Sequence, residues 1–219
     1  MKKRILISLI IVSLLGVLAG GLLDLNTYGE RSKTIPREEG KLVFSITTYD
    51  GKTESEPFLK CLGHTWLSLE NRTGHPVALK DYEIADGESV TFSVWAISGH
   101  CGVYFNLESA FITQCGRYVG RQTLSTDIDE EKLPVIEDYI DGNDRWTFTE
   151  NCSCWSVRLW NTLADENCRL KTQTLIYTPE RLQRSFCEFD CVETDKSFAG
   201  AGEIFCYRDG VRTELKLCL

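Results

Sequence analysis

The run Asn151–Trp160 combines a cysteine with the pattern of a helix start, and this combination could do covalent chemistry. Apolar residues recur at helical spacing at Trp155, Leu159, Trp160 and Leu163, so the helix is expected to be amphipathic and buried. Cys152 then lies in the first turn, where the positive end of the helix dipole favours a thiolate. A thiolate that forms near neutral pH is a nucleophile. The alternatives for Cys152 are a half-cystine or a buried structural thiol.

A thiolate nucleophile usually needs an imidazole as base and acid, together with a third group that orients the ring. The chain has three histidines, which are His64, His75 and His100. His64 follows a glycine and opens an alternating apolar segment, so it can project into a cleft from the mouth of a strand. His75 lies in a Thr-Gly-His-Pro turn and is expected to be exposed, whereas His100 lies in a glycine-flanked loop. His64 is therefore the predicted base.

Gly63-His64 at the start of a strand, followed later by Asn151-Cys152-x-x-Trp155 at the start of a helix, resembles the permuted branch of the NlpC-type papain-like cysteine hydrolases. The lecithin:retinol acyltransferase-like enzymes belong to that branch. Ordinary papain-like enzymes have the cysteine helix before the histidine strand, whereas the permuted branch has the histidine first. The resemblance covers about residues 60–165. It implies a circularly permuted papain-like fold that cleaves an amide or ester bond.

Several residues compete for the role of the group that orients the imidazole. The acyltransferase-like enzymes often carry a second histidine about one strand and turn later, and His75 falls near that place although its turn context differs. Asn106 and Glu108 lie together in the segment that follows the predicted strands, and Tyr82 lies on another strand candidate. His75 and Asn106 are therefore included in the predicted catalytic site, with Glu108 and Tyr82 as alternatives.

The N-terminus has the pattern of an export signal. Three basic residues precede an apolar run over residues 5–23, which is long for a signal-peptide core and just long enough to span a bilayer. Residues 1–23 are therefore expected to be a cleaved signal peptide or a retained membrane anchor. The basic flank places the rest of the chain outside, secreted or membrane-anchored. The net charge of -8, without basic clusters, argues against a nucleic-acid partner.

The chain has ten cysteines, and export to an oxidising compartment predicts that many of them form disulfides. A zinc site is the rival explanation, but the histidines are scattered and no CxxC pair occurs, so no metal or other cofactor is predicted. Cys154 is a rival nucleophile, although two helical steps rotate it by about 200° from Cys152. It could also form a redox partner elsewhere in the chain.

The order of elements predicts an α+β fold in which helices pack on one side of an antiparallel sheet. Strand-like segments occupy 41–49, 61–70, 77–84 and 89–95, and a helix is expected over 127–140. The expected organisation is a linker over 24–40, a permuted papain-like domain over 41–178 and a disulfide-stapled cysteine-rich appendage over 179–219, which begins with a short helix.

These patterns predict an exported cysteine hydrolase that cleaves an amide or ester bond, with a cell-wall peptide as the substrate that the resemblance favours. One alternative keeps the fold and acts on a lipid acyl group, as an acyltransferase or phospholipase. The other alternative is a disulfide-rich exported binding protein without catalysis, in which Cys152 is a half-cystine.

Overall fold

The structure is a computed structural model that describes residues 28–52, 63–97, 100–171, 177–200 and 202–215. The predicted signal or anchor over residues 1–23 lies outside these residues. Among the helices of the described ranges, none combines the length and the hydropathy that crossing a bilayer requires.

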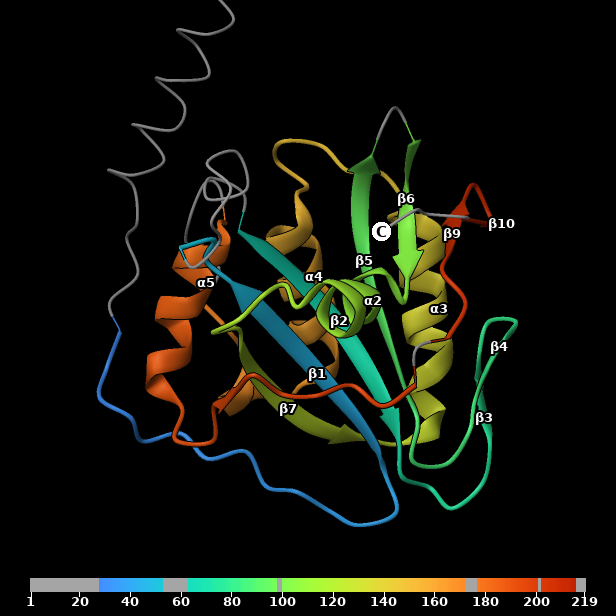
Figure 1. Cartoon of the computed structure of the whole chain (residues 1–219). Helices are drawn as coiled ribbons and strands as arrows, with labels where there is room; N and C mark the ends of the chain where they lie inside the picture. Colours follow the sequence, from blue (N-terminus) through green and yellow to red (C-terminus); the bar gives the residue numbers. More distant parts are fainter. Residues whose placement is uncertain (1–27, 53–62, 98–99, 172–176, 201, 216–219) are drawn as a thin grey trace, which may run out of the picture.

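One large antiparallel sheet forms the framework of the described chain, and its strand order is β10-β9-β6-β5-β2-β1-β7-β8 (Figure 1). Two short strands, β3 and β4, form a separate hairpin where the sequence predicted a single strand. The strands are β1 (Leu42–Tyr49), β2 (His64–Asn71), β3 (Val77–Leu79), β4 (Tyr82–Ile84), β5 (Ser89–Ile97), β6 (His100–Phe105), β7 (Gln122–Ile128), β8 (Glu193–Thr194), β9 (Phe205–Arg208) and β10 (Val211–Glu214).

Helices lie on both faces of this sheet, so the α+β class is as predicted but the placement of all helices on one side is wrong. Figure 1 shows α2 in front of the sheet and α4 behind it, and the core contacts place α3 and α5 on the α4 face. The helices are α2 (Leu107–Cys115), α3 (Leu133–Gly142), α4 (Cys152–Leu163) and α5 (Pro179–Ser185), with single 3-10 turns η2 (Glu130–Lys132), η3 (Glu166–Cys168) and η4 (Phe186–Glu188).

A left-handed residue explains why α2 reaches the other face. Asn106 has φ 58° and ψ 10°, a conformation that asparagine tolerates better than most residues, and it redirects the chain directly after β6. Leu107 then packs against Tyr104 and Cys206 on the face opposite to α4. The turn therefore brings the first residues of α2 onto the face that carries His64.

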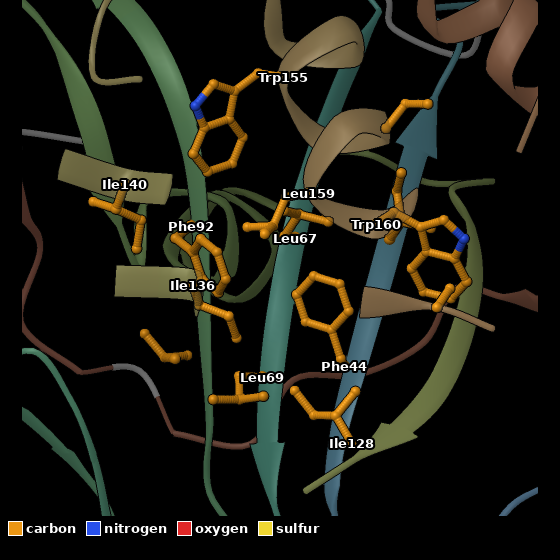
Figure 2. Packing of buried hydrophobic residues seen from close by; sticks show 14 of the residues in the cluster. Phe44, Leu67, Leu69, Phe92, Ile128, Ile136, Ile140, Trp155, Leu159 and Trp160 are labelled. Carbon is orange, nitrogen blue, oxygen red and sulfur yellow. The ribbon is translucent and has the colours of Figure 1, made fainter. Parts of the chain in front are cut away.

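The main apolar core lies between the sheet and α4. Figure 2 shows Phe44, Leu67 and Phe92 of the central strands facing Leu159 and Trp160 of the helix. These strand residues alternate with polar ones, as in the β1 run Phe44-Ser45-Ile46-Thr47, so one face of the sheet is apolar. Burial of these side chains removes apolar surface from water and fixes α4 against β1, β2 and β5.

Within the predicted appendage over 179–219, the described residues pack on the main sheet or pair with it and do not form a separate unit. α5 covers β1, while β8 and β9 pair with β7 and β6. The segment between β8 and β9 crosses the α2 face, where Lys196 Nζ donates to Ser45 Oγ at 3.2 Å and to Ser125 Oγ at 3.0 Å. The predicted disulfides are absent from the described residues, where all eight cysteines are free thiols.

The described part of the predicted linker, residues 28–40, is packed along the domain. Ile35 is 4% exposed, and Lys33 forms an isolated parallel β-bridge with Phe189. Arg37 Nε lies 2.8 Å from Asp127 Oδ1 in an ion pair. This segment is therefore part of the folded body.

Candidate active site

The predicted nucleophile and base meet at one end of the sheet, where two central strands part. The pairing of β2 with β5 runs from Leu67 opposite Phe92 to Glu70 opposite Ser89, so within the described residues the His64 end of β2 has no β5 partner. The first turn of α4 enters there, and Ser153 Oγ lies 2.9 Å from Thr65 Oγ1. His64 and Cys152 are the first residues of β2 and α4.

A glycine is required immediately before His64. A Cβ at residue 63 would lie 2.5 Å from the Tyr49 carbonyl oxygen and 2.9 Å from Cβ of Pro179. Both distances are shorter than any real Cβ contact, so Gly63 allows β2 to begin tightly against the end of β1 and the start of α5. This lack of space for a side chain explains why a glycine directly precedes His64.

Asn151 caps the helix that carries Cys152, at the helix start that the sequence predicted. Its Oδ1 accepts hydrogen bonds from the backbone N–H groups of Ser153 and Cys154, both at 3.0 Å. First-turn amides have no acceptor within a helix, and the amide of Cys152 has none among the described residues. This amide and the positive end of the helix are therefore available to an anion at the helix mouth.

The imidazole of His64 lies between a thiol and a carboxylate. Its Nε2 is 2.9 Å from Glu108 Oε1 and 3.2 Å from Ser93 Oγ, and the ring also interacts with the side chain of Cys152, which raises its pKa. Because Nε2 is engaged by the carboxylate, Nδ1 is the nitrogen that remains for the sulfur. His64 is 4% exposed and Cys152 8%, so water screens these interactions only weakly.

Glu108 is the residue that orients the imidazole. It lies in the first turn of α2 and is completely buried. Its Oε1 accepts hydrogen bonds from His64 Nε2, from Ser93 Oγ and, at 2.7 Å, from Trp95 Nε1. Sequence reasoning included Glu108 only as an alternative and missed Ser93 and Trp95. Their i, i+2 spacing on one face of a strand was the available signal, but it did not show what that face meets.

The charges of this cluster reinforce one another. Burial alone would lower the pKa of His64, but the adjacent Cys152 sulfur and then Glu108 raise that pKa to about 9. Burial would raise the pKa of Cys152, but the charge and hydrogen bond of His64, the Thr65 amide and the Ser153 hydroxyl lower it. Burial likewise opposes the ionisation of Glu108, and His64, Ser93 and Trp95 lower its pKa. The favoured state is a thiolate, an imidazolium and a carboxylate.

The structure does not bring His75, Asn106 or Tyr82 to this cluster. His75 lies in the turn after the far end of β2, with its side chain 56% exposed and Nε2 3.1 Å from Glu130 Oε1. Asn106 donates from Nδ2 to the Glu203 carbonyl at 3.1 Å and precedes α2, so it places Glu108 without touching His64. Tyr82 packs on Phe205, with ring centroids 5.4 Å apart. The side chain of His100 lies outside the described residues.

Cys154 has a different environment from Cys152, although both are in the first turn of α4. Burial is the largest influence on Cys154 and raises the pKa of its thiol. The same effect is seen at another buried thiol, Cys206, whose pKa burial raises to about 11. A thiol with a raised pKa is mostly protonated near neutral pH and reacts slowly. The structure therefore favours Cys152 over Cys154 as the nucleophile.

Comparisons with family models, with curated proteins and with solved structures found no match to this chain. Within the described residues, no group of three or more histidine, cysteine or carboxylate side chains is arranged to hold a metal ion.

Proposed function

We propose that this protein is an exported cysteine hydrolase that cleaves an amide or ester bond through Cys152, His64 and Glu108. The observation that carries the proposal is the buried chain of contacts from the Cys152 thiol through the imidazole to Glu108 Oε1. A nucleophile, a base and a group that orients the base are the parts that covalent acyl transfer needs. The proposal that the protein is exported rests on the signal-like pattern of residues 1–23 in the sequence.

The reaction follows from the charges of the resting site. The Cys152 thiolate attacks the substrate carbonyl carbon, and the carbonyl oxygen becomes an oxyanion. When the carbon–nitrogen or carbon–oxygen bond breaks, the His64 imidazolium gives its proton to the leaving group and a thioester remains on Cys152. Neutral His64 then takes a proton from water, and the resulting hydroxide attacks the thioester carbon. Breakage of the carbon–sulfur bond releases the acid and restores the thiolate and imidazolium.

The mouth of α4 supplies the charge stabilisation for the oxyanion. Asn151 already satisfies the amides of Ser153 and Cys154, so the amide of Cys152 is the first-turn donor left for the oxyanion. The helix dipole adds to this donor. Glu108 keeps the imidazole in one tautomer and one orientation while its proton moves.

A cell-wall peptide is the proposed substrate, because the resemblance to the permuted NlpC-type hydrolases favours it and an exported enzyme meets the cell wall. Purified protein should release new amino or carboxyl termini from muropeptides. Cys152→Ala and His64→Ala should each lower this turnover by at least about 10³-fold, because the nucleophile and the base act as a unit. Turnover that survives both changes would end the proposal.

A lipid acyl group is the second candidate, and the loop before Cys152 supports it. Trp146 and Phe148 are 38% and 53% exposed although the loop is anchored, with the Trp146 amide 2.8 Å from the Cys101 sulfur. Exposed aromatic rings in the loop that leads to the nucleophile can bind an acyl chain. Assays of a phospholipid and of a muropeptide with the same wild-type and Cys152→Ala preparations separate the two substrate classes.

A further inference from the structure

Trp95 touches both partners of the His64–Glu108 pair. Its ring centroid lies 4.0 Å from the imidazole centroid with the planes tilted by 40°, and its Nε1 donates to Glu108 Oε1 at 2.7 Å. Trp95 is half-buried, and its indole also packs against the cluster of Tyr104 and Leu107. The indole is therefore held by the surrounding structure in a place where it can hold two other side chains.

The carboxylate of Glu108 is fixed through one oxygen. Oε1 accepts from His64, Ser93 and Trp95, whereas Oε2 is buried and has no hydrogen-bond partner among the described residues. A buried carboxylate held at one oxygen can rotate about its side-chain torsions unless its donors are rigid. The Ser93 hydroxyl can turn to another acceptor, but the indole N–H points in one fixed direction.

We propose that Trp95 is a positioning residue, which holds Glu108 through its indole N–H and holds the protonated His64 ring through its π face. A cation beside an aromatic face is favoured, and the effect grows when water is excluded. Trp95 transfers no proton and forms no bond to the substrate. This inference rests on the proposed function, because it assigns the residue that keeps the proposed base and its carboxylate in register.

The test uses the alkylation of Cys152 by iodoacetamide as a function of pH, followed by mass spectrometry of the Cys152 peptide in the full chain. The titratable groups that face His64 are Cys152 of α4, Glu108 of α2 and Tyr118 of the loop before β7. A mispositioned imidazolium stabilises the thiolate less, so the midpoint of the alkylation curve should move to higher pH.

Trp95→Phe keeps a ring beside His64 and removes the N–H, whereas Trp95→Leu removes both. Below the midpoint, we expect alkylation about threefold slower in Trp95→Phe and about tenfold slower in Trp95→Leu, because one unit in pKa changes the thiolate fraction tenfold. Turnover should fall in kcat with KM unchanged. Trp160→Phe is the matched control, since it also removes a buried indole N–H, donated to the Cys168 carbonyl at 3.1 Å, and should leave the midpoint unchanged.

Circular dichroism establishes that each variant is folded. If Trp95→Leu does not fold, the alkylation curve of Trp95→Phe alone tests the proposal. A low wild-type midpoint that both Trp95 variants share would overturn the role of Trp95 and leave the proposed function standing. A shift in Trp160→Phe as large as in Trp95→Phe would also overturn it, because the effect would then be one of general stability. A wild-type midpoint at the ordinary thiol value would remove both proposals together.

Discussion

Two histidines each lie beside a glutamate in opposite environments, one at the start of β2 and the other in the turn after its far end. At one end His64 Nε2 lies 2.9 Å from Glu108 Oε1, and at the other His75 Nε2 lies 3.1 Å from Glu130 Oε1. The side chain of His64 is 5% exposed and that of Glu108 0%, whereas those of His75 and Glu130 are 56% and 45% exposed.

This comparison shows that a histidine–glutamate contact becomes chemically useful through its surroundings. Water screens the exposed pair, and such surface pairs contribute little to stability. The buried pair faces a thiol, two further donors and an aromatic ring, and its interactions are strong because water is excluded. The difference arises because β2 and β5 separate at the His64 end and admit the start of α4 there.

The largest expected effect on turnover is the difference between two single variants, in which one histidine or the other is replaced by glutamine. His64→Gln should lower turnover by about 10²–10⁴-fold, because it removes the base and acid of the reaction. His75→Gln should leave turnover within about twofold, as surface substitutions usually do. Assays of both variants on the substrate that the wild type cleaves measure the difference, and equal losses in the two would remove the distinction between the ends of β2.

The two glutamates give the next test. Glu108→Gln removes the negative charge that helps raise the pKa of His64 to about 9, so that pKa should fall toward its ordinary value of 6.5. His64 must be protonated to act as the acid, so the alkaline limb of the pH–turnover profile should move to lower pH, and turnover at pH 7 should fall by about 10²-fold. Glu130→Gln is the control, and a limb that stays near pH 9 in Glu108→Gln would show that Glu108 does not orient the base.

Alanine substitution of two asparagines distinguishes an effect on the stability of the fold from an effect on the reactivity of Cys152. Asn151→Ala removes the cap of α4 and should cost about 1 kcal/mol in the free energy of unfolding. It should also slow the labelling of Cys152 a few-fold, because the first turn loses its support. Asn71→Ala removes a buried amide that donates to the carbonyls of His75 and Ile84, and should cost about 1–3 kcal/mol without changing the labelling rate. Urea denaturation and iodoacetamide labelling measure both, and slower labelling in Asn71→Ala would contradict the assignment.

Local patterns in the sequence were sufficient for the elements that present Cys152 and His64. The helix-start pattern before Cys152 and the apolar spacing of Trp155, Leu159 and Trp160 predicted α4, and the alternation after Gly63 predicted β2. The helix expected over 127–140 is present as η2 followed by α3, but its expected first residues, Asp127 and Ile128, are the last residues of β7. These elements could be predicted because the sequence carries their caps and their periodicity.

Elements shaped by tertiary contacts were missed. In α2 four consecutive residues, Leu107 to Ala110, are buried, so a simple amphipathic pattern is absent. β7 has Thr123 and Ser125 on a polar inner face, where they pair with Thr47 and Ser45, and such a strand resembles a loop in sequence. Glu108 could not be selected from the sequence, because its position opposite His64 depends on the left-handed turn at Asn106.

The central claim is that Cys152 is ionised near neutral pH because the protonated ring of His64 faces it. The most direct measurement is the rate of Cys152 alkylation by iodoacetamide across the pH range, in the wild-type chain and in His64→Gln. We predict a wild-type midpoint well below the ordinary thiol pKa of about 8.5, and a midpoint at or above that value in His64→Gln. The same midpoint in both proteins, or an ordinary midpoint in the wild type, would contradict the account.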